Sequence, residues 1–263
     1  MANYFTGRYY KHQKNGNTIC FIIGHTADTE FVQILTTYDV IQYDSLNGVK
    51  ISRSELRIDY PEVQGCVRYG KLLPLHSHIM GPFHFLPMQC NHEVISMRHT
   101  IQGSFKVHGK RIDLNDGIGY IEGDYGRSFP KEYLWLHCND FSDDLSVMVS
   151  VADIPFCGIH FTGCICAITF RGKEYRLATY YGVRIHAANE KKVILTQGKY
   201  RLDILISNAD SYPLRSPING KMINTIHESS CPKAKFRFTE RDEVIFQTMS
   251  THCSFECNID INR

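Results

Sequence analysis

Short runs of β-branched and aromatic residues recur along the whole chain, while the periodicity of an amphipathic helix is almost absent. Runs of this kind, separated by turn residues, are typical of β-strands. This pattern constrains the fold more than any other feature. The runs expected to form strands are 19–24, 31–36, 38–43, 93–97, 104–108, 133–138, 145–152, 164–170, 174–179, 182–186, 192–196, 200–206, 234–238 and 243–248.

The residues between these runs favour tight hairpin turns. Strands spaced about 8–12 residues apart indicate a sandwich or a barrel. Closure into barrels also removes the exposed edges that so many strands would create. We therefore expect an all-β fold of two antiparallel barrels or sandwiches packed together. The turns are Asn47-Gly48, His108-Gly109-Lys110, Arg171-Gly172-Lys173 and Asn208-Ala209-Asp210.

Two stretches interrupt the strand pattern. Residues 60–90 hold four prolines and three glycines, and we interpret them as a long irregular excursion, of a length that is usually functional or mobile. Residues 139–144 contain three aspartates and offer the best boundary between the two halves. The expected domains are an N-terminal barrel, 1–140, and a C-terminal barrel, 141–263.

Composition excludes several classes of protein. The net charge is +2, from 29 basic and 27 acidic residues, so nothing indicates binding to nucleic acid or to an anionic membrane surface. The N-terminus has no apolar run, and no window reaches the ~18 apolar residues of an integral membrane helix. We expect a cytoplasmic protein whose ten cysteines are reduced thiols. The oligomeric state is not addressed by the sequence.

Zinc-site spacing is absent from the sequence, since no paired C-x-x-C motif occurs. We therefore expect no metal and no cofactor. One alternative stays open, because Cys90, His92 and His99 lie close together in the sequence and could bind a metal. The other interpretation of the two histidines is that they are hydrogen-bonded core residues.

The stretch 117–141 is the most unusual in the chain. Glu122 and Asp124 are two residues apart, so in an extended chain they face the same side. In the strand that follows, Trp135, His137 and Asn139 share one face. That face is a site if it points into a cavity and an ordinary polar face if it points to water. Periodicity alone does not distinguish the two.

The segment GYIEGDYGRSFPKEYLWLHCN resembles the signature of the tocopherol cyclase-like family. The segments HFLPMQCNHEVISMRHTIQGSFKVHGKRIDL, SVMVSVADIPF, CICAITFRGKEYRLATYYGVR and YPLRSPINGKM with HESS also resemble this family, as does the opening FTGRYYKHQ. The resemblance covers nearly the whole chain. It implies two lipocalin-like β-barrels with a ligand cavity, and a hydrophobic small-molecule substrate.

Plant and cyanobacterial members of the family close a chromanol ring on a prenylated hydroquinone. An acid protonates the alkene, and the neighbouring phenol oxygen traps the tertiary cation. Such a site needs an acid, a dry cavity and aromatic faces. The resemblance implies Glu122 as the general acid, with Asp124 as the alternate. Trp135, Tyr125 and Tyr133 would form an aromatic wall, and His137, Asn139, His92 and His99 would hydrogen-bond the quinol oxygens.

Some residues depart from the family pattern or allow a second interpretation. Arg8, Tyr125 and His137 replace the tryptophans and glutamine of the family motif, so the substrate can differ from a tocopherol precursor. Arg127 is a candidate ion-pair partner of the two carboxylates, and that pairing would spoil the acid. For Glu228 we favour a strand-end charge over a second acid.

Three functions therefore remain open. The first is a cyclase of the isomerase type, the second is a hydratase of an isoprenoid double bond, and the third is a lipocalin-like carrier without turnover. A Glu122 that faces bulk water and pairs with Arg127 would favour the carrier. A buried, unpaired Glu122 or Asp124 facing a cavity would favour the enzyme. The two carboxylates could also simply cap the backbone around Gly123 and Gly126.

Overall fold

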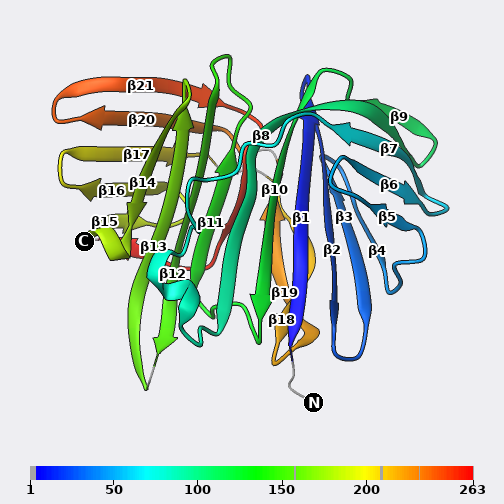
Figure 1. Cartoon of the computed structure of the whole chain (residues 1–263), viewed down its shortest axis with the longest axis horizontal. Helices are drawn as coiled ribbons and strands as arrows, with labels where there is room; N and C mark the ends of the chain where they lie inside the picture. Colours follow the sequence, from blue (N-terminus) through cyan, green and yellow to red (C-terminus); the bar gives the residue numbers. More distant parts are fainter. Residues whose placement is uncertain (1–3, 157, 208–209, 231, 263) are drawn as a thin grey trace.

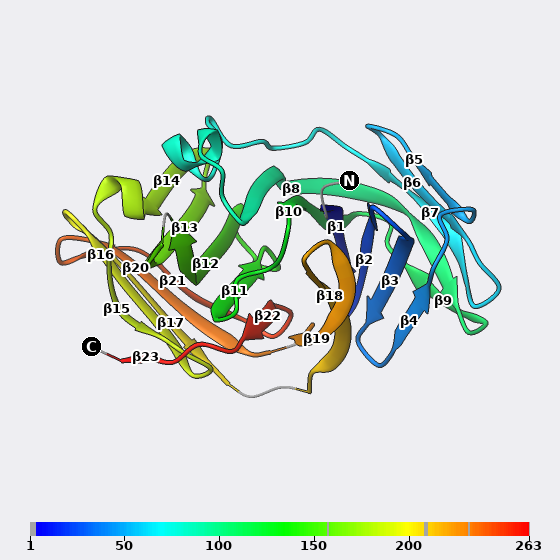
Figure 2. The same ribbon diagram turned by 90° about the horizontal axis from the view of Figure 1, so that it is seen from below.

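A computed structural model describes residues 4–156, 158–207, 210–230 and 232–262. Strands make up most of these residues, and the only helical turns among them are two short 3₁₀ segments, η1 (Gly81–Phe85) and η2 (Thr179–Tyr181). Three antiparallel sheets result (Figures 1 and 2). The turn expected at Asn208-Ala209 lies outside the described residues.

Sheet A contains the first ten strands and folds over on itself at the right of Figure 1. Its concave side encloses an apolar core that includes Phe21, Ile34, Leu56 and Phe105. The order is β4 (Val40–Tyr43), β3 (Glu30–Thr36), β2 (Asn17–Thr26), β1 (Phe5–Lys14), β10 (Gly117–Gly126), β8 (Cys90–Val107), β7 (Val63–Tyr69), β6 (Glu55–Asp59) and β5 (Val49–Ile51), with β9 (Lys110–Asp113) beside β8.

Sheets B and C pack face to face around a second apolar core, with their strands crossing in Figure 1. Sheet B has the order β14 (Lys173–Ala178), β13 (Ile159–Phe170), β12 (Leu145–Phe156), β11 (Tyr133–Cys138), β22 (Ser254–Cys257), β19 (Lys221–Ser229) and β18 (Tyr212–Ile218). Sheet C has the order β21 (Glu243–Ser250), β20 (Ala234–Glu240), β17 (Tyr200–Ile206), β16 (Lys192–Gln197), β15 (Arg184–Ala188) and β23 (Ile261–Asn262).

The expected all-β fold of two packed lipocalin-like halves is confirmed. The chain leaves sheet A after Gly126 and enters sheet B at Tyr133, so β11 pairs with strands of the second half. The division of the chain into domains 1–140 and 141–263 stays a prediction.

The irregular excursion expected at 60–90 is wrong in its first part, because 63–69 form β7. Gly65 has a φ of 152°, and a Cβ there would lie 2.2 Å from the carbonyl oxygen of Ser104. The glycine that suggested a loop is therefore a close-approach position within a sheet. Residues beyond Tyr69 do run irregularly along the molecule through η1 until β8 begins.

A third apolar layer lies where sheet A packs against sheet B. Central strands such as β1 and β11 are thus buried on both faces for most of their length. In β1, for example, Tyr10 points into the N-terminal core while Tyr9 points into the layer between the sheets. This layer positions the candidate site.

Candidate functional site

A cavity of about 170 Å³ lies between sheets A and B. Strands β1, β2, β3, β8 and β10 of sheet A form one wall, which we call wall A, and strands of sheet B form the opposite wall, wall B. Met80, Phe83 and Met88, from the irregular segment before β8, also line it. Most of the lining is apolar or aromatic, so the few carboxyl groups in it stand out.

The strand registers align these carboxyl groups in two facing rows. On wall A, Gln33, Ile22, Tyr9 and Glu122 are successive cross-strand neighbours from β3 to β10. On wall B, Glu228, Glu256, Trp135 and Ser150 are successive cross-strand neighbours from β19 to β12. Each residue points inward because side chains alternate along a strand.

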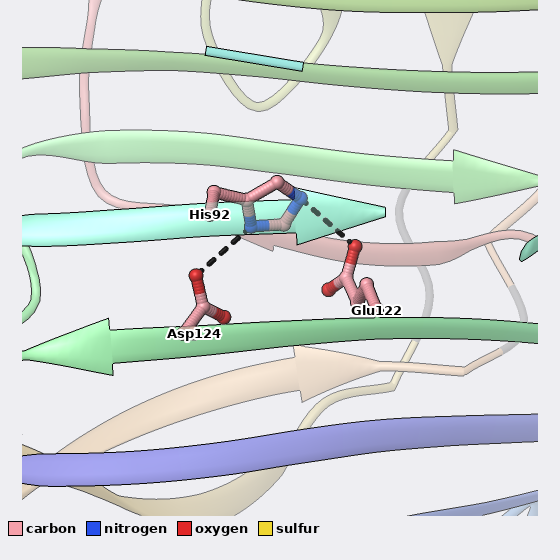
Figure 3. A group of neighbouring side chains, drawn as sticks. All are labelled: His92, Glu122 and Asp124. Atoms are coloured by element: carbon pink, nitrogen blue, oxygen red, sulfur yellow. Dashed lines mark hydrogen bonds and ion pairs between the residues drawn. The ribbon is translucent and has the colours of Figure 1, made fainter. Parts of the chain in front are cut away.

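His92 joins the two carboxylates of wall A (Figure 3). Its Nδ1 lies 2.9 Å from Oδ1 of Asp124, and its Nε2 lies 3.2 Å from Oε2 of Glu122. Register shifts in the β8–β10 pairing on either side of Ile121 adjust this strand next to the site. Burial disfavours a charged imidazole, but Glu122 and Asp124 outweigh it and raise the pKa of His92 well above its usual value.

Glu122 is 4% exposed and links the two walls. Its Oε2 accepts hydrogen bonds from the Tyr120 hydroxyl and, at 3.1 Å, from Nε1 of Trp135 on wall B. Glu122 is therefore buried at the cavity and paired, with His92 as its partner. The alternative that Glu122 and Asp124 cap a tight turn is wrong, because β10 runs straight through both residues.

His92, Glu122 and Asp124 also form the one group of potential metal ligands found among the described residues. The two ring nitrogens of His92 face different carboxylates, which is the geometry of an imidazolium between two anions. The alternative grouping of Cys90, His92 and His99 is wrong. His99 points away, with its Nδ1 3.0 Å from Oγ of Ser96 and its ring against Tyr69.

Wall B carries two carboxyl groups of a different kind. Glu228 is fully buried, and its Oε1 accepts a hydrogen bond from the Tyr9 hydroxyl. Its Oε2 has no hydrogen-bond partner among the described residues. Glu256 accepts a hydrogen bond from the Tyr133 hydroxyl. Burial raises the pKa of Glu228 to about 7, and burial together with Glu228 raises the pKa of Glu256 well above its usual value.

The other residues predicted for the site divide by position. Trp135 and Tyr133 line the cavity beside Glu122, Asp124 and His92. His137 and Asn139 share their strand face but lie beyond the cavity lining. His137 stacks on Tyr120, with ring centroids 3.5 Å apart. Asn139 joins the two sheets by accepting from Gln13 and donating to the carbonyl of Gly119.

Tyr125 and Arg127 lie outside the lining at the end of β10. Tyr125 follows Asp124 directly and so takes the opposite face of the strand. Arg127 is exposed and forms no ion pair with Glu122 or Asp124 in the described part of the chain, so the expected Arg127 pairing is wrong.

Sequence reasoning missed Tyr9 and Glu256, and it interpreted Glu228 as a strand-end charge. That interpretation is wrong, because Glu228 is fully buried in the cavity wall. A signal was present, since HESS was one of the segments that resembled the family. In β19, exposed and half-buried residues alternate up to Glu228, which marks an inward-facing position.

The sequence model of the tocopherol cyclase-like family matches residues 43–259, which is most of the chain. The chain belongs to this family. No curated protein matches it significantly in sequence. The crystal structure of CghA with Sch210972 is similar in fold, with a TM-score of 0.63 and 8% identity over 98% of this chain and 89% of CghA. The crystal structure of CghA superposes with the same TM-score, at 6% identity over 100% of this chain and 90% of CghA.

Proposed function

We propose that this tocopherol cyclase-like protein is an enzyme that closes a chromanol-type ring on a prenylated hydroquinone. A carboxyl group of the cavity protonates the prenyl double bond, and the neighbouring phenol oxygen captures the tertiary cation. The reaction is an isomerisation, because the alkene gains one proton and the phenol loses one.

One observation carries this proposal: buried carboxyl groups line an otherwise apolar and aromatic cavity. An apolar cavity suits the prenyl chain and excludes water that would trap the cation. The rings of Tyr9, Trp135 and Tyr133 face the same space and can stabilise positive charge. Holding the phenol over the double bond supplies orientation, which is a large part of the rate of such reactions.

Glu122, Asp124, His92, Trp135 and Tyr133 are the sequence-predicted residues that we propose to contact the substrate. His137, Asn139 and His99, behind the lining, are proposed as supports of the walls. Among the described residues, no helix is long and apolar enough to cross a membrane.

The carrier alternative is favoured by one feature, the ion pair between Glu122 and His92. A carrier would bind the quinol and return it unchanged. A hydratase would add water to the same cation and give a product heavier by one water molecule. The mass and the configuration of the recovered product therefore distinguish the cyclase, the hydratase and the carrier.

The test is to incubate purified protein with a dimethyl-phytyl-benzoquinol and to analyse the products by mass spectrometry with chiral separation. The cyclase predicts a single chromanol enantiomer from wild type and loss of this product in Glu122→Gln. A racemic product at the rate of the acid background would contradict the proposal. Bound, unchanged quinol would favour the carrier instead.

A further inference from the structure

Glu228 and Glu256 form a carboxyl pair on wall B. They are direct cross-strand partners in β19 and β22, and both line the cavity. Side chains at such paired positions start from Cβ atoms about 4.5–5.5 Å apart. The two carboxyl groups are therefore close neighbours in one apolar cavity.

Two arginines, Arg8 and Arg215, line the same cavity, and Arg215 forms an ion pair with Asp44. Among the described residues, no lysine, arginine or histidine forms an ion pair with Glu228 or Glu256. The nearest ammonium group, Lys11, is buried and donates at 3.0 Å to the carbonyl of His252. The other ionisable groups that face Glu228 are Tyr9 of β1, Cys20 of β2, Glu122 of β10, Tyr133 of β11 and Glu256 of β22.

Two neighbouring carboxyl groups in an apolar site cannot both be ionised without a strong repulsion, so such a pair keeps a proton. Wall A differs, because His92 lies between its two carboxyl groups and places one positive charge beside them. The two walls therefore place their carboxyl groups in different electrostatic surroundings.

We propose that Glu228 is the proton donor of the site, sharing its proton with Glu256, and that Glu122 on the opposite wall accepts the phenol proton. This inference rests on the proposed function. Glu228 suits a donor because its Oε2 is buried in the cavity wall and engaged in no hydrogen bond. Glu122 suits an acceptor because Tyr120 and Trp135 both donate to its Oε2, with Nε2 of His92 3.2 Å from the same oxygen, leaving Oε1 for the substrate.

The step balances without an oxidant or a second substrate. The O–H bond of Glu228 breaks as a C–H bond forms at the less substituted alkene carbon. The phenol oxygen then bonds to the tertiary carbon, and its proton passes to Glu122. After the chromanol leaves, Glu122 loses this proton to water and Glu228 takes one from water. Burial raises the pKa of Glu228 to about 7, so a large fraction of this carboxyl group carries its proton near neutral pH.

The test compares wild type with Glu228→Gln, Glu256→Gln and the surface control Glu243→Gln, whose side chain is exposed on β21. Turnover of the dimethyl-phytyl-benzoquinol is measured against pH. We expect Glu228→Gln to lower kcat by about 10²- to 10⁴-fold, the range of general acid catalysis. Glu256→Gln should move the alkaline decline of the wild-type profile to lower pH, because Glu228 loses its acidic neighbour. Glu243→Gln should behave as wild type.

Infrared spectra of the same proteins give a readout that does not need turnover. At about pH 6 the wild type should show the band of a buried neutral carboxylic acid, and Glu228→Gln should lose it or shift it. A folded Glu228→Gln variant with undiminished kcat would overturn the assignment of Glu228 as donor. The proposed cyclase function would not be affected by this result. A wild type without turnover would contradict the cyclase, and the infrared band would then still decide whether the pair holds a proton.

Discussion

The two walls of the cavity use the same acidic side chains with opposite electrostatic results. On wall A, Glu122 and Asp124 flank His92, whose two ring nitrogens each face one carboxylate. On wall B, Glu228 and Glu256 are cross-strand neighbours, and each accepts a hydrogen bond from a tyrosine hydroxyl. The difference between the walls is therefore one imidazole, which places a positive charge beside the carboxyl groups of wall A.

Because of this difference, the two walls can have different roles in proton transfer. A substrate between the walls meets a neutral acid on one side and an ion-paired carboxylate on the other. Ring closure by protonation needs both, because one proton arrives at carbon as another leaves oxygen. The following predictions test this contrast, from the largest expected effect to the smallest.

Removing the imidazole should have the largest effect on stability. In His92→Gln, two carboxylates lose their cation, and breaking a buried charged pair costs about 3 kcal/mol of unfolding free energy. Urea unfolding at neutral pH measures this loss. The matched change on wall B, Glu256→Gln, removes a repelling neighbour and should leave the stability unchanged or higher. Equal losses in both variants would remove the contrast between the walls.

The pH dependence of stability should reveal the proton on wall B. The folded pKa of Glu228 lies near 7, through burial, above the usual 4.5. Between these values the folded state binds more protons, so this stabilisation is full below pH 4.5 and lost as the pH rises through 7. We expect an effect on the order of 3 kcal/mol, absent in Glu228→Gln. Parallel wild-type and Glu228→Gln curves between pH 5 and 8 would contradict the assignment.

The N-terminal core provides an internal control of opposite sign. Burial lowers the pKa of His12 to about 3 and that of His99 to about 4, below the usual 6.5. The unfolded chain then binds more protons below pH 6.5, so stability falls as the pH falls from 6.5. This acid loss should persist in Glu228→Gln, because both histidines lie in the core of the other half.

Trp135→Phe should have a smaller effect, because it deletes the indole N–H that joins wall B to Glu122. Loss of one hydrogen bond to a buried carboxylate costs about 1–2 kcal/mol. A double-mutant cycle measures the coupling. Trp135→Phe should couple to Glu122→Gln and act independently of the surface change Glu243→Gln. Zero coupling with Glu122→Gln would show that the two walls are not linked at this point.

Arg127→Ala should have the smallest effect. The side chain is exposed beyond β10, and surface substitutions of this kind change stability by about 0.5 kcal/mol or less. Activity should also stay at the wild-type level. A large drop in kcat would mean that Arg127 reaches the substrate in a way that the fold does not indicate.

Local patterns in the sequence predicted much of the fold and only one wall of the site. Contiguous runs such as 145–152 and 164–170 became strands because their composition is unambiguous. β7 was not predicted because Gly65 was interpreted as a turn residue. In the structure this glycine allows the backbone of β7 to lie close to Ser104 of β8. Glu122 and Asp124 were recognisable together because they are two residues apart on one strand.

Wall B could not be predicted in the same way. Glu228 and Glu256 come from separate strands that pair only in the folded protein, and Tyr9 reaches Glu228 across more than two hundred residues of sequence. Nothing local marks such partners. The inward direction of Trp135 could likewise not be predicted, because both faces of β11 are buried and the alternation of polar and apolar residues then no longer distinguishes them.

The most direct test of the account is the cyclisation of the dimethyl-phytyl-benzoquinol in deuterium oxide, with the position and configuration of deuterium in the chromanol read by NMR. Because an exchangeable acid fixed on wall B protonates the alkene, we predict one deuterium on the ring methylene beside the quaternary carbon, in a single configuration. This product should disappear in Glu228→Gln. Deuterium distributed equally over both faces of that methylene, or a wild-type product without deuterium there, would contradict the account.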